Sequence, residues 1–173
     1  LTRSSAASDV YKRQIKDYAI GQTSMYNVVG RFMTEFQLVR DRLKYIVFLE
    51  DDPLDFEVYS DLLSDHLNGV DIKQYDDVDE KFYSKYPPGH TLVLLDLNLS
   101  GTKGLDVYKY KLKSYHYTVY VHTSSDNPHD IELCKKQGLT AYFQKKIGKD
   151  KIKDQLMTIL NFYELNLINK FRD

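Results

Sequence analysis

Cysteine and long apolar runs are both scarce in this sequence. Cys134 is the only cysteine among the 173 residues, which excludes an internal disulfide and any zinc motif built from several cysteines. No apolar run approaches the roughly 20 residues that a membrane-spanning helix needs. The formal net charge is −1, so charge gives no sign of a nucleic-acid or membrane partner. The single cysteine suits a reducing compartment, and we expect a cytoplasmic protein.

The composition indicates one globular domain with an N-terminal extension. Apolar residues make up 42% and charged residues 28%, ordinary values for a folded domain. Residues 4–14, "SSAASDVYKRQ", resemble the translation of a sequencing adapter, so we expect residues 1–14 not to be native, and the true start and any lost upstream domain stay open. Residues 15–44 are expected to be a linker and an amphipathic helix, because apolar residues recur at spacings of three and four over 24–44. That pattern suits a helix packed on its own domain, a short dimerising coil or a signalling helix.

From residue 45 onward, predicted strands and helices alternate. The strands are expected at 45–49, 70–75, 91–96, 117–123 and 141–145. The helices are expected at 56–67, 78–86, 104–115, 127–136 and 152–167, with Asn68-Gly69 and Gly138 as stop signals. Strand–helix alternation of this kind predicts an α/β domain whose parallel sheet is covered on both faces.

Polar side chains stand at the ends of these strands. Right-handed crossovers place the C-terminal ends of parallel strands at one edge of the sheet, where ligands bind in such folds. The residues expected there are Glu50, Asp51 and Asp52 after the first strand, Asp96 after the third, Thr123, Ser124 and Ser125 after the fourth, and Lys145 after the fifth. Neighbouring carboxylates repel unless a cation lies between them, and Mg²⁺ binds carboxylate and phosphate oxygens. Because a lysine and a hydroxyl complement phosphoryl oxygens, the pattern predicts a site for a metal ion and a phosphoryl group.

Each of these groups also has an ordinary structural interpretation. An acid triplet after a strand is typical of a solvated turn or of an N-cap, and a lone Asp such as Asp96 is common in turns. The hydroxyl run is typical of a helix cap, and Lys145 with Lys146 of a solvated strand end. The convergence of complementary groups from four strand ends favours function. His122, inside the fourth strand, is expected to be a packed residue rather than a phosphodonor.

Residues 45–170 resemble a response-regulator receiver domain. The motifs that carry the resemblance are "VFLEDDPLD" (47–55), "LVLLDLNLSGTKGLDV" (92–107), "VYVHTSSDNP" (119–128) and "GLTAYFQKK" (138–146). The resemblance implies a flavodoxin-like (βα)5 fold over residues 45–173, a doubly wound five-stranded parallel sheet with strand order 2-1-3-4-5. The helix expected over 24–44 would be an addition to that fold.

The resemblance also implies roles for single residues. Asp96 is expected to accept the phosphoryl group, and Gly104 falls where the family has its helix-starting glycine. Mg²⁺ or Mn²⁺ is expected to bind Glu50, Asp51, Asp96 and the backbone carbonyl of Asn98. The groups expected around the phosphoryl group are Lys145 and Thr123 as its ligands, Thr123 with Tyr142 as the switch pair, Ser124 as the small neighbour, and Ser125 with Asn98 as residues that tune hydrolysis.

The implied activity is signalling rather than conventional enzymology. A histidine kinase or phosphotransfer protein would donate the phosphoryl group, the domain would catalyse only its own phosphotransfer and dephosphorylation, and a downstream protein would read the change. No nucleic acid or membrane is expected to be contacted directly, and a homodimer is left open. The alternatives are a pseudo-receiver that serves as a docking module without phosphorylation, and the receiver end of a truncated hybrid histidine kinase.

Two positions depart from the family pattern. The family usually has proline four residues after the phosphoacceptor, where this sequence has Ser100, and a cis-proline after the lysine, where it has Lys146. A cis bond before a residue other than proline costs about 2.5–4 kcal/mol, so a reshaped loop and a changed direction of Lys145 are open possibilities. Other phosphate-handling classes fit less well, since the sequence has no P-loop motif and "DLN" lacks the second acid of a D-x-D phosphatase.

Overall fold

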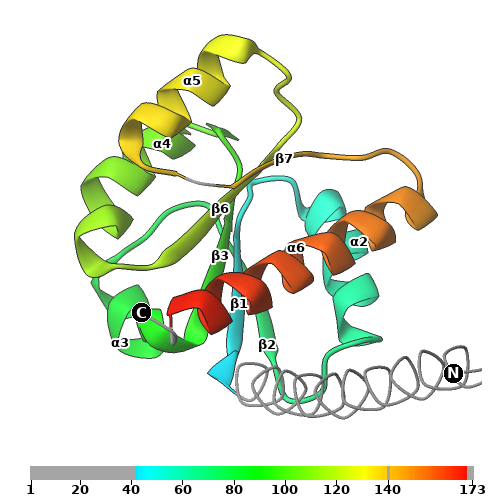
Figure 1. Ribbon diagram of the computed structural model, residues 1–173. Coiled ribbons are helices and arrows are strands. Elements are labelled where there is room, and N and C mark those ends of the chain that lie inside the picture. Colours follow the sequence, from blue (N-terminus) through cyan, green and yellow to red (C-terminus); the bar gives the residue numbers. More distant parts are fainter. Residues whose placement is uncertain (1–41, 140, 171–173) are drawn as a thin grey trace, which may run out of the picture. The chain divides into compact units, whose positions relative to one another are not determined.

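A parallel five-stranded sheet lies between two layers of helices in the computed structural model, which describes residues 42–139 and 141–170 (Figure 1). The strands are β1 (Tyr45–Leu49), β2 (Asp71–Tyr75), β3 (Thr91–Leu95), β6 (Thr118–Thr123) and β7 (Tyr142–Gln144), in the order β2-β1-β3-β6-β7. Counted along this sheet alone, the order is 2-1-3-4-5, so the expected flavodoxin-like arrangement is confirmed. The register pairs Leu49 of β1 with Tyr75 on one side and Leu95 on the other.

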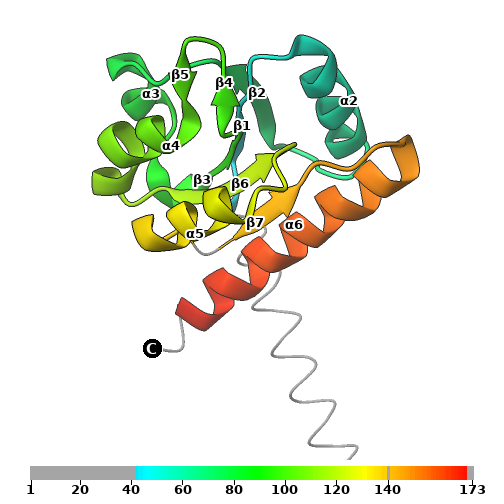
Figure 2. The ribbon, with the colours of Figure 1, turned by 90° about the horizontal axis from the view of Figure 1, so that it is seen from above.

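The two faces of the sheet are covered by different helices. Helices α2 (Pro53–Ser64) and α6 (Lys149–Lys170) cover one face, while α3 (Glu80–Lys85), α4 (Gly104–Val107) and α5 (Pro128–Gln137) cover the other (Figures 1 and 2). Successive strand residues point to opposite faces, so Ile46 and Phe48 join the core under α2 and α6, whereas Val47 and Leu49 join the core under the other helices. The central strand β3 is buried along its whole length, as a strand covered on both faces should be.

Local sequence signals account for where α2 begins and for where α5 begins and ends. Pro53 opens α2, and the side chain of Asp52 accepts hydrogen bonds from the backbone N–H groups of Leu54 (2.9 Å) and Asp55 (3.4 Å). The N-cap interpretation of the acid triplet therefore holds for Asp52. Helix α5 begins after the N-cap Asn127 and ends at Gly138, whose φ of +91° is a left-handed conformation that favours glycine.

The segment after β3 differs from its prediction. A short hairpin of β4 (Asn98–Leu99) and β5 (Thr102–Lys103) precedes α4, and strands of two residues carry no readable period. The single helix expected over 104–115 is three consecutive pieces: α4, a π-helical turn at Tyr108–Leu112 and a 3-10 turn at Lys113–Tyr115. A further 3-10 turn spans Pro88–His90, and α2 ends at Ser64, short of the expected residue 67.

Most of the N-terminal predictions lie outside the described residues. The adapter-like residues 1–14 belong to that part, as does the expected helix over 24–44 apart from residues 42–44. Leu43, the last apolar residue of that pattern, is buried in the core under α2 and α6. Within residues 42–139 and 141–170, no helix combines the length and the apolar character that a bilayer crossing requires.

Candidate functional site

Three strand ends meet at the carboxylate of Asp96. Asp96 follows β3 and is 4% exposed, and its backbone N–H donates to Leu49 O at 2.9 Å, which continues the sheet register. The hydroxyl of Thr123, at the end of β6, donates to Asp96 Oδ1 at 2.7 Å. The ammonium of Lys145, just after β7, donates to Asp96 Oδ2 at 2.7 Å. The structure thus brings the predicted acceptor, hydroxyl and amine into direct contact.

Lys145 lies at the centre of a group of carboxylates. Its Nζ donates to Glu50 Oε2 at 2.5 Å and to Asp55 Oδ2 at 3.0 Å, in addition to Asp96. Burial alone would lower the pKa of Lys145, but the hydrogen bonds to Asp96, Glu50 and Asp55 outweigh burial and raise it. The ammonium is therefore charged at physiological pH and offsets the acids around it.

Glu50 is the most deeply buried acid of the site. It is 2% exposed, its Oε1 accepts the backbone N–H of Asp52 at 3.1 Å, and its carbonyl accepts the side-chain amide of Gln74 at 2.9 Å. Burial raises the pKa of Glu50, and the contacts with Lys145 and the Asp52 N–H oppose that shift without cancelling it. A buried carboxylate in this position gains from any additional cation placed next to it.

Asp51 faces the hairpin rather than Lys145. Its Oδ2 accepts the backbone N–H of Ser100 at 3.0 Å and also the Ser100 hydroxyl. The Ser100 hydroxyl is the main reason that the pKa of Asp51 is lowered. Proline, the residue usual here in the family that the sequence resembles, has neither an N–H nor a hydroxyl, so this link depends on the departure at Ser100.

Gly104 lets the chain pass close to Asp96. A Cβ atom placed on Gly104 would lie 1.9 Å from the backbone oxygen of Asp96, a distance that no side chain tolerates. The Gly104 N–H also donates to Leu97 O at 3.0 Å, and the Asn98 N–H donates to Asp96 Oδ1 at 3.0 Å. The hairpin and the start of α4 are therefore fixed against the loop that carries Asp96.

The loop after β6 connects Thr123 to Tyr142. The Ser125 N–H contacts Thr123 Oγ1 at 3.4 Å, and the Ser125 hydroxyl donates to Asp130 Oδ2 at 2.6 Å. The phenolic hydroxyl of Tyr142 donates to the Ser125 carbonyl at 2.9 Å. Ser124, which lies between Thr123 and Ser125 in the sequence, is exposed. Thr123 and Tyr142 are therefore linked through Ser125 in one short loop.

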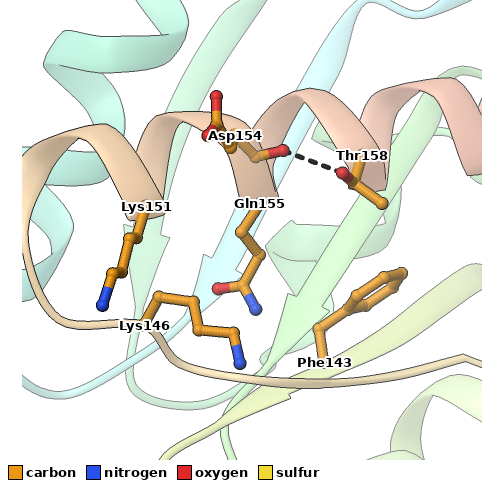
Figure 3. Close-up of a pocket in the computed structure, with 6 residues that line it drawn as sticks. All are labelled: Phe143, Lys146, Lys151, Asp154, Gln155 and Thr158. Atoms are coloured by element: carbon orange, nitrogen blue, oxygen red, sulfur yellow. Dashed lines mark hydrogen bonds between the residues drawn. The ribbon is translucent and has the colours of Figure 1, made fainter.

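Lys146 does not turn Lys145 away from the site. The peptide bonds of the described residues are all trans, including the bond between Lys145 and Lys146. The Lys145 N–H donates to Thr123 O at 2.7 Å, so β6 still directs this part of the chain. Lys146 itself lies in a shallow groove of about 550 Å³ beside α6, which is lined by Phe143, Lys146, Lys151, Asp154, Gln155 and Thr158 (Figure 3).

The comparisons with known proteins identify the fold of the chain. No protein-family model and no curated protein sequence matches the chain. Its structure is similar to that of a response regulator receiver domain from Rhodospirillum rubrum, with a TM-score of 0.58 and 22% identity over 70% of this chain and 94% of that one. The chain has the fold of a response regulator receiver domain.

Two further solved response-regulator structures are also similar to that of this chain. The phosphorylated cyanobacterial phytochrome response regulator RcpA gives a TM-score of 0.59 and 22% identity, over 70% of this chain and 94% of that one. The Mn²⁺-bound form of the response regulator Rcp1 gives a TM-score of 0.54 and 21% identity, over 69% of this chain and 94% of that one. The receiver fold is therefore established from structure, while the roles of single residues rest on the site itself.

The acids of this receiver fold offer oxygen donors to a cation. Glu50, Asp51 and Asp96 stand at one sheet edge, and a set of carboxylate oxygens is what hard divalent ions such as Mg²⁺ prefer. Among the described residues, no three His, Cys, Asp or Glu side chains are already arranged as a metal-binding group. Their oxygens contact Lys145, Thr123 and Ser100 instead, so the donor types fit a metal ion while the side chains are turned toward other partners.

His122 lies beside the site without lining it. It is 1% exposed, its ring packs edge-on against Tyr59 with the centroids 4.9 Å apart, and its Nε2 is 3.2 Å from Gln155 Oε1. Burial lowers the pKa of His122 to about 4. Because the Gln155 amide donates to Gln144 O at 2.6 Å, its oxygen is left to accept from the neutral imidazole. His122 is a packed strand residue, as expected.

Asp55 is the residue of the site that sequence reasoning missed. Its carboxylate reaches Lys145 from the first turn of α2, two residues after Pro53. A signal was present, because a proline directly behind the acidic N-cap Asp52 places the helix start over the strand ends. That signal places the first turn of α2, but the contact between Asp55 and Lys145 also depends on the position of Lys145 after β7.

Proposed function

We propose that this chain is a phosphoacceptor receiver of a two-component phosphorelay. Asp96 would take a phosphoryl group from the phosphohistidine of a histidine kinase or of a phosphotransfer protein, and a downstream protein would recognise the altered domain. The observation that carries the proposal is the carboxylate of Asp96 held at 2.7 Å by both Thr123 and Lys145, at the ligand-binding edge of a receiver fold.

The chemistry is one phosphoryl transfer. A carboxylate oxygen of Asp96 forms the new bond to phosphorus, the bond from phosphorus to the donor imidazole nitrogen breaks, and the imidazole leaves with the electron pair. Lys145 and Thr123 supply N–H and O–H groups to the transferring oxygens, and both already stand beside Asp96 before the donor arrives. This preorganisation means that the groups around Asp96 contribute position and charge to the transfer.

A divalent cation is part of the proposal. Mg²⁺ or Mn²⁺ would be held by Glu50, Asp51, Asp96 and the backbone carbonyl of Asn98, where it would offset negative charge on the carboxylates and on the phosphoryl oxygens. The buried Glu50, whose pKa is raised by burial, would gain from such an ion. The Mn²⁺-bound form of Rcp1 is a precedent within the same fold.

The proposed output is a shift between two arrangements of the loop after β6. A phosphoryl group on Asp96 would draw the Thr123 hydroxyl toward it, and Ser125 contacts that hydroxyl through its N–H. Tyr142 is tied to the carbonyl of the same serine, so its ring would change position with the loop. The phosphoryl group then acts by stabilising one of two conformations of the free domain.

The proposal is tested by intact-protein mass spectrometry of the full chain after incubation with acetyl phosphate, with and without Mg²⁺, beside Asp96→Asn. We expect one phosphoryl adduct that needs Mg²⁺ and is absent from the variant. A folded wild-type protein that takes up no phosphoryl group from acetyl phosphate or from a histidine kinase would refute the proposal. It would favour a docking module that works without phosphorylation.

A further inference from the structure

Lys145 already uses its full donor capacity in the unphosphorylated domain. An ammonium group has three N–H donors, and Lys145 Nζ lies 2.5 Å from Glu50, 2.7 Å from Asp96 and 3.0 Å from Asp55. If the proposed function holds, Lys145 must also bind a phosphoryl oxygen. The donor that now contacts Asp96 passes to the phosphoryl group when that carboxylate becomes the acyl phosphate, and Glu50 and Asp55 remain as partners that hold the ammonium back.

Glu50 and Asp55 differ in how easily they can be released from Lys145. The side chain of Glu50 is 3% exposed, so without the ammonium it would be left as a buried and poorly solvated charge. The side chain of Asp55 is 42% exposed, and its contact with Lys145 is the longest of the three. Water can solvate a half-exposed carboxylate, so losing this contact costs little.

The backbone around Asp55 also stabilises its carboxylate after release from Lys145. Asp55 lies in the first turn of α2, where the helix dipole stabilises negative charge. Its own N–H is bound by the N-cap Asp52, so the turn is held whether or not Lys145 is in contact. Release therefore needs a change of side-chain position and no unwinding of α2.

We propose that Asp55 is a positioning residue that occupies the third donor of Lys145 in the free domain and competes with the phosphoryl group for it. Asp55 orients the ammonium next to Asp96 before phosphorylation. It then opposes the bound phosphoryl group in two ways, by withholding the donor and by adding negative charge nearby. Asp55 thus limits how tightly the site holds a phosphoryl group.

The test is a titration of the full chain with beryllium fluoride, a stable mimic of a phosphoryl group, at saturating Mg²⁺. We expect Asp55→Asn to bind the mimic up to about five-fold more tightly than the wild type at low salt, which is the range of a partly exposed ion pair. The difference should shrink at high salt because it arises from charge. Asp55→Glu, which restores the carboxylate, should return binding toward the wild-type value, a rescue that a merely structural role does not predict.

Two controls separate the possible failures. Asp61→Asn makes the same charge change at an exposed position on α2 and should leave the affinity for beryllium fluoride unchanged. Wild-type binding with equal or weaker binding by Asp55→Asn overturns the role of Asp55 while the proposed function stands. A folded wild type that binds no beryllium fluoride overturns the proposed function and this inference with it. In the ligand-free protein, faster hydrogen exchange of the Lys145 ammonium in Asp55→Asn is expected, and an unchanged rate contradicts the orienting role.

Discussion

Replacing Gly104 with alanine should destabilise the domain, although alanine is the better helix former. An added Cβ would lie 1.9 Å from the Asp96 carbonyl oxygen, and real Cβ contacts of this kind do not fall below 3.0 Å, so the two chain segments must separate by at least 3.0 − 1.9 = 1.1 Å. Both atoms belong to the backbone, and no side-chain rotation relieves the overlap. Overpacking of this kind costs about 1–3 kcal/mol, and loss of the Gly104 N–H bond to Leu97 O adds about 1 kcal/mol.

The expected loss is therefore about 2–4 kcal/mol in the free energy of unfolding, measured by urea denaturation with an unchanged slope. Helix propensity alone predicts the opposite sign, a gain of up to about 1 kcal/mol, so the direction of the change decides between the two explanations. Gly89→Ala is the matched control, because a Cβ there meets no atom within 4 Å, and it should change stability little. A Gly104→Ala protein as stable as the wild type would refute the argument from close approach.

Three further predictions follow from the buried and paired groups. The pKa of His122 is about 4 in the folded protein and 6.5 in the unfolded chain, so the free energy of unfolding is full above pH 6.5 and falls by about 3 kcal/mol as the pH drops to 4. An NMR titration of the imidazole measures this pKa, and a value near 6.5 would contradict the burial argument. Lys145→Met leaves buried carboxylates unpaired and should cost about 3–5 kcal/mol in urea unfolding without Mg²⁺, a loss that the exposed Lys146→Met should not reproduce. Ser100→Pro removes both hydrogen bonds to Asp51, so the pKa of that acid should rise in an NMR titration, and an unchanged pKa would show that the hairpin contact is absent in solution.

Strands β1 and β3 were predictable because their own residues show that both faces are buried. Strand β1 and residues 92–95 of β3 are continuous apolar runs, which is the pattern of a strand covered on both faces. The position of Asp96 followed from the same reasoning, since a residue directly after a buried parallel strand stands at the ligand-binding edge. Because the strands are parallel, residues that are far apart in the sequence but follow a strand lie together at one edge of the sheet.

The parts that escaped prediction depend on contacts between distant segments. The contact of Asp55 with Lys145 joins residues that are 90 positions apart, and that of Ser100 with Asp51 joins residues that are 49 apart. The π-helical turn at Tyr108–Leu112 has the same apolar spacing as an α-helix would have, so periodicity does not reveal it. Both Ser100 and Lys146 were visible as departures from a family pattern. Only the structure shows that Ser100 adds a link to Asp51 and that Lys146 leaves the direction of Lys145 intact.

The most direct test of the central proposal is to locate the phosphoryl group. Borohydride reduces an aspartyl phosphate to homoserine, so the full chain would be phosphorylated in the presence of Mg²⁺, reduced, digested and mapped by mass spectrometry. The proposed mechanism predicts homoserine at position 96 alone, and none when Mg²⁺ is withheld. Homoserine at another acid, or an unmodified Asp96 in protein that carries a phosphoryl group, would contradict it.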